Sequence, residues 1–366
     1  MRIFALFLVL ISTAQAREIF VNPETGDDAN DGSSEAALAT GQKAVSLAQP
    51  GDVIQLLPKN AVYRQSITFR GKSDLTIEGN GVTLDGADPL PAVGWEDLGQ
   101  QLLRRKIPRT VYDRHLLIVD GKANRMGRTA GKNSLDLFPA ADDLKEGEFR
   151  FEIIDDEFGW LFVRGSVENL EWSTRSNGIG TGGECSNIVV RNLNARHFLN
   201  DGFNIHGHAV GMKFYSIQGY DCFDEGFSAH DTCECEIDGG KFWGCEHAIA
   251  DVNNCVTHYR NCEFRDSVHV DVLFRGNRHS LTDCLIVNTT PATALSAGPG
   301  GEKDKPFELT LTNVEIRGDA EKPARIRIDG GKASLSSCRF KNVKLNTIGA
   351  EVESTETQVD GDWVKE

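Results

Sequence analysis

The sequence contains two copies of one pattern: Asn200-Asp201-Gly202-Phe203-Asn204-Ile205-His206-Gly207 and, 24 residues later, Asp224-Glu225-Gly226-Phe227-Ser228-Ala229-His230-Asp231. Apolar and polar residues alternate in each copy, as in a β-strand that buries one face. The alternation predicts that Phe203, Ile205, Phe227 and Ala229 face a core, and that Asn204, His206, Ser228 and His230 face outward. If the copies are neighbouring coils, His206 and His230 lie about 4.8 Å apart on one exposed sheet.

A triplet with a small or polar centre recurs through the second half of the chain. Its copies are Arg191-Asn192-Leu193, Tyr215-Ser216-Ile217, Arg260-Asn261-Cys262, Thr282-Asp283-Cys284, Thr312-Asn313-Val314 and Ser336-Ser337-Cys338, with a weaker copy at Asp238-Gly239-Gly240. Successive centres are 24, 23, 22, 22, 30 and 24 residues apart. Short apolar strands that repeat at such a period, with Asn, Asp or Gly at the turns, indicate a β-solenoid.

Three of the nine cysteines, Cys262, Cys284 and Cys338, take the triplet position that carries Leu193, Ile217 and Val314 in other coils. Free cysteine packs as a small apolar residue, so we expect these thiols to be buried. The odd number of cysteines leaves at least one unpaired. Cys233 and Cys235 share one face of a strand but have no matching pair, so a cysteine zinc site is not predicted.

The segment from Met1 to Ala16 has the features of a secretory signal peptide. Arg2 precedes an apolar run from Ile3 to Ile11, which is too short to cross a bilayer, and small residues follow at Ala14-Gln15-Ala16. No later segment is apolar enough to span a membrane, so the sequence predicts export to the periplasm or the extracellular space. The formal net charge of -15 argues against nucleic acid as a partner.

The remaining chain divides into four parts. Residues 17–88 are predicted to form an N-terminal cap and the first coils, with a helix at 38–48 between strands at 19–22 and 53–57. Residues 89–172 interrupt the repeat and contain a predicted hairpin with arms at 148–154 and 159–163. They hold three of the five tryptophans (Trp95, Trp160 and Trp172), for which core packing is the first expectation and sugar stacking the alternative. Coils fill 173–352, and 353–366 is predicted to be a frayed acidic tail.

The N-terminal part resembles the cap of pectate-lyase-like right-handed parallel β-helix proteins. The resemblance is carried by an extended strand, the loop Gly26-Asp27-Asp28-Ala29-Asn30-Asp31-Gly32, a helix that ends in Ala48-Gln49-Pro50-Gly51-Asp52, and the strand Val53-Ile54-Gln55-Leu56-Leu57. It implies an all-β fold, a single-stranded right-handed parallel β-helix with a cap helix and a β-rich insertion. It also implies that the protein binds or acts on carbohydrate. Closed coil ends and the absence of heptads make a monomer the expectation.

Continuing the coils from His206 and His230 places Asn253 and then Arg275 in the same outward column. The neighbouring outward column is predicted to be Asn204, Ser228, Asp251 and Leu273. Asp201, Asp224, Glu225, Asp231, His269 and Asp271 lie around these columns. An imidazole near neutral pKa is suited to proton transfer, so this polar face is the candidate site. Outward residues of a solenoid are also polar simply because water solvates them.

One local motif is similar to that of mannuronan C5-epimerases, which runs Tyr-Gly-Phe-Asp-Pro-His-Asp. In Glu225-Gly226-Phe227-Ser228-Ala229-His230-Asp231, the residues Gly226, Phe227, His230 and Asp231 match it. The tyrosine, aspartate and proline positions differ. By this resemblance, His230 is the proton-transfer residue.

Three functions follow from these residues. A polyuronate lyase or epimerase would use His230 with His206 at the C5 proton, Arg275 at the carboxylate, Glu225 or Tyr220 at the leaving oxygen, and Asp251 beside them. Asn204, Asn253, Asp231, Asp271 and His269 would bind the sugar chain. A glycoside hydrolase would use two of Asp224, Glu225, Asp231, Asp251 and Asp271. The third possibility is a non-catalytic carbohydrate-binding protein. Calcium, held by Asp201, Glu225 and Asp251, fits the first two functions.

Overall fold

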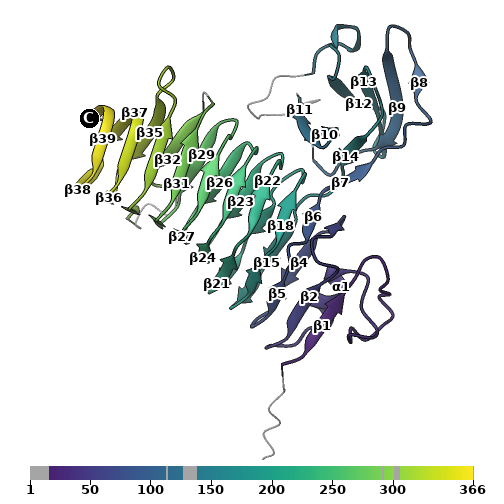
Figure 1. Ribbon diagram of the computed structural model, residues 1–366, viewed down its shortest axis with the longest axis horizontal. Coiled ribbons are helices and arrows are strands. Elements are labelled where there is room, and N and C mark those ends of the chain that lie inside the picture. The colour runs from purple at the N-terminus through teal and green to yellow at the C-terminus, as the bar shows by residue number, and fades with distance from the viewer. Residues whose placement is uncertain (1–15, 113, 127–137, 291, 301–305, 366) are drawn as a thin grey trace, which may run out of the picture.

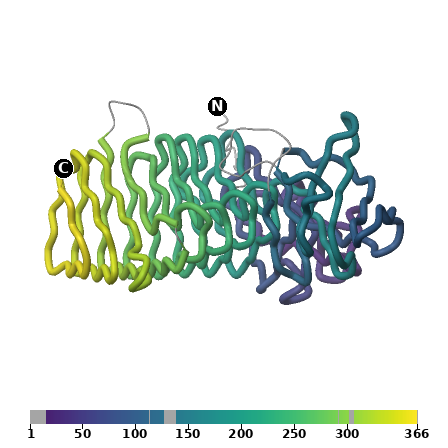
Figure 2. Tube along the Cα trace, turned by 90° about the horizontal axis from the view of Figure 1, so that it is seen from above, coloured from purple at the N-terminus to yellow at the C-terminus, as the bar shows by residue number. Residues whose placement is uncertain are grey.

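The computed structural model describes residues 16–112, 114–126, 138–290, 292–300 and 306–365, so the predicted signal peptide lies almost entirely outside the described residues. The chain winds into a parallel β-helix of about 13 turns, as predicted. Coils stack one behind another along the long axis, and a separate β-rich lobe stands beside the N-terminal half (Figures 1 and 2). No helix in the described part of the chain is long and apolar enough to cross a membrane.

After the first coil, which contains β1 and the cap helix, each coil contributes to three parallel ladders. The first ladder contains β1 (Glu18–Val21), β2 (Val53–Leu56), β5 (Thr76–Glu78), β17 (Val189–Arg191), β21 (Met212–Tyr215), β24 (Glu234–Asp238), β27 (Val256–Arg260), β30 (Arg278–Thr282), β33 (Glu308–Thr312), β36 (Lys332–Ser336) and β38 (Glu351–Thr355). The second contains β3 (Val62–Tyr63), β6 (Thr83–Asp85), β18 (Asn194–Arg196), β22 (Gln218–Tyr220), β25 (Lys241–Trp243), β28 (Glu263–Arg265), β31 (Leu285–Asn288) and β34 (Glu315–Gly318).

The third ladder carries the candidate site. It contains β4 (Ile67–Arg70), β15 (Ile179–Gly182), β19 (Phe203–Ile205), β23 (Glu225–Ala229), β26 (His247–Val252), β29 (Val270–Arg275), β32 (Thr293–Ala297) and β35 (Ala324–Asp329). The long strands β37 (Arg339–Ile348) and β39 (Gln358–Lys365) continue both the second and third ladders. A short pair, β16 (Glu184–Ser186) and β20 (His208–Val210), lies between the third and first ladders.

The repeated triplet forms a one-residue corner between the first and second ladders, which we call the tight corner. Its central residues Asn192, Ser216, Asn261, Asp283, Asn313 and Ser337 have φ between 51° and 54°, and Gly239 has φ 75°. Short polar residues and glycine tolerate this left-handed conformation best. Amide side chains also link successive corners, because Asn313 Nδ2 donates to Asp283 Oδ1 at 2.6 Å. This geometry explains why the triplet centre is small or polar.

The residue after each tight corner enters the core. Leu193, Ile217 and Val314 are buried there, and so are Cys262, Cys284 and Cys338, as predicted. All nine cysteines are buried free thiols.

The cap helix α1 (Gly41–Leu47) covers the first coil. It begins after Thr40, whose Oγ1 accepts a hydrogen bond from Lys43 N at 3.1 Å, three residues later than the predicted start. Gly41, Ala44 and Val45 form its buried face. The helix therefore shields the apolar end of the solenoid, as predicted for a cap.

The insertion consists of two antiparallel four-stranded sheets and a 3₁₀ turn, η1 (Ala141–Asp143). One sheet contains β7 (Ala87–Pro89), β10 (Leu116–Val119), β11 (Lys122–Arg125) and β14 (Leu170–Ser173). The other contains β8 (Glu96–Asp97), β9 (Leu102–Pro108), β12 (Phe149–Ile153) and β13 (Phe158–Arg164), and β12 and β13 form the predicted hairpin. Trp172 is 2% exposed in the lobe's own core, and Arg104 stacks on Trp160.

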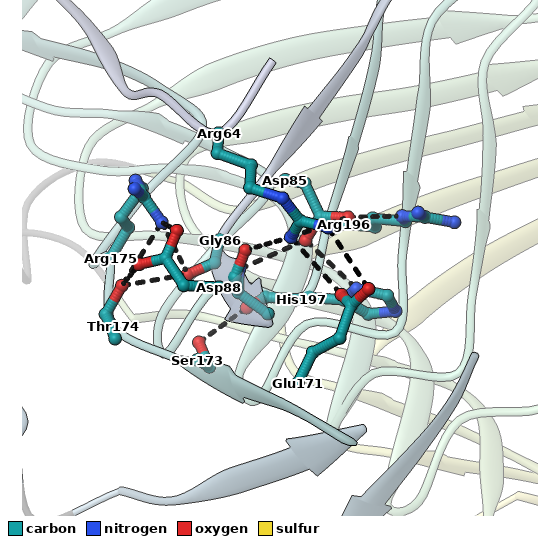
Figure 3. A network of polar contacts seen from close by, with 11 residues as sticks. Arg64, Asp85, Gly86, Asp88, Glu171, Ser173, Thr174, Arg175, Arg196 and His197 are labelled. Carbon is teal, nitrogen blue, oxygen red and sulfur yellow. Dashed lines mark hydrogen bonds and ion pairs between the residues drawn. The ribbon is translucent and has the colours of Figure 1, made fainter. Parts of the chain in front are cut away.

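A buried charged network joins the insertion to the solenoid where the chain leaves and returns (Figure 3). The fully buried Asp85 lies 2.9 Å from Arg196 Nε, 3.0 Å from His197 Nδ1 and 4.0 Å from Arg64 Nη1. Arg64 also reaches Glu171 of β14 at 3.1 Å. Burial alone would raise the pKa of Asp85, but the contacts with His197 and Arg196 lower it overall. The network therefore holds the root of the insertion through compensated charges.

The C-terminal segment differs from its prediction. Residues 353–365 are not a frayed tail, because β39 pairs in parallel with β37 and β38 pairs with β36. Val359 and Trp363 pack against the core. Alternating apolar residues in this acidic segment are sufficient to extend the solenoid.

Candidate functional site

The third ladder begins with the predicted register and then departs from it. Phe203 pairs with Phe227 and Asn204 with Ser228, as the repeated pattern predicts. In the next coil, Ser228 pairs with Ala250 and Ala229 pairs with Asp251. The predicted column pairs Asp251 with Ser228, so the observed pairing is shifted by one residue from the predicted one. Because successive side chains in a strand point to opposite faces, this one-residue slip turns Asp251 into the core.

Asp251 is consequently a buried acid and not part of an exposed face. It is fully buried and accepts hydrogen bonds from Ala229 N at 3.0 Å, Thr257 Oγ1 at 2.7 Å and Tyr259 OH at 2.8 Å. Burial raises its pKa to about 7, although these hydrogen bonds oppose the rise. Its carboxylate has no surface through which it could contact a polymer.

Two of the predicted sugar-binding residues are buried as well. Asp271 is fully buried, accepts from Ser267 N and Asn288 Nδ2, and has its pKa raised to about 6 by burial. Asn204 is 6% exposed, because the side chain of Asp201 caps it. The prediction that these two residues face a sugar chain is therefore wrong.

His206 and His230 are neighbours, as predicted. Their rings stack with centroids 3.9 Å apart, and Asp231 Oδ2 lies 3.4 Å from His206 Nδ1. Burial, with a smaller contribution from His206, lowers the pKa of His230 to about 4.

Arg275 and Asn253 do not complete this histidine group. Arg275 pairs with Val252, which occupies the position after Asp251 and so separates Arg275 from His230. Arg275 Nη2 instead donates to Ser296 Oγ at 2.7 Å. Asn253 and Asp231 occupy left-handed corners of neighbouring coils, and Asn253 Oδ1 accepts a hydrogen bond from Asp231 N.

A different group of polar residues lies at the N-terminal ends of the third-ladder strands, where the chain arrives from the second ladder. Backbone hydrogen bonds stack Asn200 on Asp224, and Glu246 on His269. Asp224 in turn accepts from His247 N, and Glu225 pairs with His247 in the adjacent column. We call Asp201, Asp224, Glu225, His247 and Arg114 the carboxylate cluster. Arg114 comes from the insertion, and the other members come from successive coils.

Side-chain contacts tie the carboxylate cluster together. Glu225 Oε1 lies 2.9 Å from His247 Nδ1, and Asp201 Oδ1 accepts from Glu225 N at 3.2 Å. Arg114 Nη1 forms an ion pair with Asp224 Oδ2 and donates to Asn200 Oδ1. One ligand atom each of Asp224, Glu225 and His247 lies within 4.8 Å of the others. The cluster thus holds the carboxyl groups of Asp224 and Glu225 side by side.

The environments of these carboxylates differ. Burial raises the pKa of Glu225 well above its usual value, and the nearby charges of Asp201 and Asp224 add to the rise. Burial also raises the pKa of Asp201. Asp224, in contrast, forms an ion pair with the guanidinium of Arg114. A carboxyl group that burial favours in its protonated form therefore lies beside one that is paired with a cation.

The cluster remains accessible from the surface. The side chains of Glu225 and Asp224 are 12% and 17% exposed. The loop that carries Asp224 is fixed by the insertion, because Arg125 stacks over Phe223 at 5.4 Å and donates to the carbonyl of Cys222. Phe223 also packs with Leu116 and Ile118 of β10. The insertion therefore both supplies a cation and positions the loop.

The remaining predicted residues lie at two opposite ends of the third-ladder strands. The structure brings Glu225, Asp201 and His269 to the N-terminal ends, whereas Asp231, His206 and His230 lie at the opposite end of the same strands. Sequence reasoning missed His247, although this residue occupies the place of Glu225 one coil later and therefore fits the repeat. It also missed Arg114, for which the repeat offers no signal because the residue belongs to the insertion.

The predicted calcium ligands are not brought together. Asp251 faces the core near the end of β26, whereas Asp201 precedes β19 and Glu225 is the first residue of β23. Asp224, Glu225 and His247 are close enough to ligate an ion, but Arg114 already neutralises Asp224, and calcium prefers oxygen-only sites. Asp85, Glu171 and His197 are likewise close together, yet Arg64 and Arg196 already bind these carboxylates. Neither group fits calcium.

Comparisons with known proteins address the fold. No family model matches the chain, and no curated protein matches its sequence. The structure of XylC with xylose matches at 12% identity and a TM-score of 0.67, over 93% of this chain and 70% of that protein. A glycoside hydrolase matches at 12% identity and a TM-score of 0.54, over 96% of both chains. The pectate lyase Pel9A matches at 8% identity and a TM-score of 0.47, over 96% of this chain and 80% of that one. Together with the cap, the three ladders and the tight corners, the matches to XylC and to the glycoside hydrolase show that the chain has a parallel β-helix fold.

Proposed function

We propose that this protein is a glycoside hydrolase whose reaction centre is the carboxylate cluster. The proposal rests on the pair Glu225 and Asp224, two adjacent carboxyl groups of which Glu225 has a pKa raised well above its usual value and Asp224 is ion-paired with Arg114. Such a pair supplies the acid and the anion that glycosidic bond cleavage requires. Glu225 acts as the general acid, and Asp224 is the anionic partner.

The spacing of the pair favours a double displacement. Oxygen atoms of Asp224 and Glu225 lie within 4.8 Å, whereas inverting enzymes separate their carboxyl groups by about 6.5–9.5 Å to admit a water. In the first step, Glu225 gives its proton to the leaving oxygen while Asp224 forms a bond to the anomeric carbon. In the second step, Glu225 takes a proton from water, which attacks that carbon and releases Asp224.

The other members of the cluster position this pair. The hydrogen bond between His247 Nδ1 and Glu225 Oε1 fixes the orientation of the acid. Arg114 orients Asp224, and Asp201 anchors the backbone of Glu225. Arg114 is already paired with Asp224, so this guanidinium is not free to bind the carboxylate of a polyuronate. A neutral glycan is therefore the preferred substrate, and two structural neighbours are known as a glycoside hydrolase and as a protein in complex with xylose.

The test compares the purified protein with Glu225→Gln and Asp224→Asn on neutral and acidic polysaccharides, with new reducing ends as the readout. Removal of a general acid or a nucleophile lowers kcat by about 10²–10⁴-fold or more. Glu263→Gln, which removes a surface carboxylate from β28, is the matched control and should retain full activity. NMR of the first-formed product should show retention of the anomeric configuration. Equal activity of Glu225→Gln and the wild type would overturn the proposal.

A second candidate is the polyuronate lyase or epimerase predicted from the histidines. It is favoured by the stacked pair His206 and His230, because a neutral imidazole can accept a proton. It is weakened by Arg275, which lies with Ser296 and not beside His230. An ultraviolet-absorbing unsaturated product that His230→Ala abolishes would favour this candidate. Turnover of no polymer would favour the non-catalytic binding protein.

A further inference from the structure

A hollow of about 380 Å³ lies on the outer face of the first ladder, on a different sheet from the carboxylate cluster. Four successive strands, β21, β24, β27 and β30, form it. Its lining includes Tyr215, Glu236, Asp238, His258, Arg260 and Ser280. We call this feature the first-ladder groove. None of the residues that line it takes part in the proposed reaction.

The sequence creates the groove through a change in side-chain size along two outward columns. One column runs from Tyr215 through Asp238 and Arg260 to the small Thr282, and the other runs from Glu236 through His258 to the small Ser280. Alternate residues of these strands face the core, so the outward positions are free to vary. Long side chains at one end and short ones at the other leave a depression on an otherwise regular sheet.

The groove offers a ligand the guanidinium of Arg260 and one oxygen of Asp238, since Asp238 Oδ1 already accepts a hydrogen bond from Asn261 Nδ2 at 2.8 Å. Among the described residues, no side chain forms a hydrogen bond or ion pair with the exposed guanidinium of Arg260. His258 Nδ1 lies 2.8 Å from Ser280 Oγ, and burial lowers the pKa of His258, so this imidazole is neutral at pH 7. Tyr215 is 38% exposed although it is a large aromatic residue.

We propose that the first-ladder groove binds one or two rings of a neutral oligosaccharide without cleaving it. An exposed tyrosine ring can pack on the apolar face of a sugar, while its hydroxyl remains solvated. Planar guanidinium and carboxylate groups, here Arg260 and Asp238, bind neighbouring hydroxyls in pairs. The volume falls in the range of about 300–1,000 Å³ that is typical of small-ligand sites. The ligand class rests on the proposed function, whereas the location of the site does not.

The experiment measures binding of xylohexaose, cellohexaose and mannohexaose to Glu225→Gln protein, in which cleavage is blocked, by isothermal titration calorimetry. Tyr215→Ala and Arg260→Ala are then added separately to this background. We expect each to weaken binding of the preferred hexasaccharide at least tenfold. Ser334→Ala, on the same face but outside the groove, is the control and should bind normally. Circular dichroism confirms that each variant is folded.

The outcomes separate the two proposals. Binding unaffected by Tyr215→Ala and Arg260→Ala overturns the groove, and so does the absence of binding to all three hexasaccharides. In otherwise wild-type protein, both groove variants should hydrolyse a small aryl glycoside at the normal rate, because this substrate occupies only the reaction centre. If hydrolysis is absent but groove-dependent binding persists, the proposed hydrolase is wrong and the groove proposal stands.

Discussion

Asp251 shows how one side chain can couple stability to pH. The pKa of this buried carboxyl is about 7, against an ordinary value of 3.8, so the folded protein binds its proton more tightly than the unfolded chain does. Its contribution to stability is complete below pH 4 and is lost as pH rises towards 7. Asparagine at this position does not titrate, and it can still accept from Ala229 N.

Asp251→Asn should therefore flatten the pH dependence of unfolding. Between pH 4 and 7, the stability of the variant relative to wild type should rise by up to roughly 4 kcal/mol, at about 1.4 kcal/mol per pKa unit. Urea unfolding at several pH values measures the difference. Glu353→Gln, an exposed change on β38, should leave the slope unaltered. Parallel pH profiles for Asp251→Asn and wild type would contradict this account.

The cysteines give a second prediction at the residue scale. All nine thiols are buried, and burial raises the pKa of Cys235 and Cys262 well above the usual value. The hydrogen bond with Cys262 lowers the pKa of Cys284, so burial is what shields this thiol from a reagent. A thiol reagent at pH 8 should label none of them in the folded protein and nine after denaturation without reductant. A smaller number after denaturation would show that neighbours such as Cys222 and Cys245, already in contact, are joined by a disulfide.

At the scale of the element, the tight corner is the device that sets the coil geometry. Asn313 contributes in two ways. It tolerates a φ of 51°, and its side-chain amide donates a hydrogen bond to Asp283. Asn313→Gly retains the first contribution and loses the second, whereas Asn313→Ala loses both. Glycine should lower the free energy of unfolding by about 1 kcal/mol, and alanine by about 2 kcal/mol. Thermal unfolding of both variants checks this order, and equal losses would show that the left-handed conformation costs alanine nothing.

The same element shows what sequence reasoning can establish. The triplets identify every tight corner from Asn192 to Ser337 because only a few residue types tolerate a positive φ. The register between β23 and β26 is harder to predict. The segment Ala248-Ile249-Ala250 is apolar on both faces, so alternation cannot show which side chain is inward. Ala229 pairs with Asp251 and not with Val252, and this pairing reverses the expected orientation of Asp251.

At the scale of the molecule, the network around Asp85 connects the two bodies. Its buried carboxylate pairs with Arg196 and Arg64, whose side chains are 28% and 30% exposed. Asp85→Asn removes the charge that compensates these guanidiniums, but water solvates part of both, so the change should cost about 3 kcal/mol, the lower end of the range for a broken buried pair. Hydrogen exchange should show loss of protection in β7 and β14, where the insertion is rooted. Glu96→Gln breaks the exposed pair with Arg104 in the same lobe and should cost less than about 1 kcal/mol. Protection that is equal in both variants would show that other contacts hold the lobe.

The way in which the insertion packs against the solenoid could not be predicted from the sequence. The hairpin and the bounds of the insertion follow from local patterns, but its docking depends on tertiary contacts such as Phe223 with β10. Arg114 reaches Asp224 from a distant part of the chain, and no periodicity relates the two. Sequence reasoning consequently places the candidate site near the histidine column, at the opposite end of the same strands from the carboxylate cluster.

The tight corner has a consequence for how this architecture can change. A corner of one left-handed residue has no room for extra chain, so additional length between the first and second ladders would break the stack. The corner between the second and third ladders already accommodates an entire lobe, rooted next to Asp85. New loops grafted there, on either side of Phe223, would lie beside the carboxylate cluster and would leave the strands of the coils unchanged. The first corner of each coil is thus fixed in length, whereas the second corner can take up additional chain, and the carboxylate cluster lies beside that second corner.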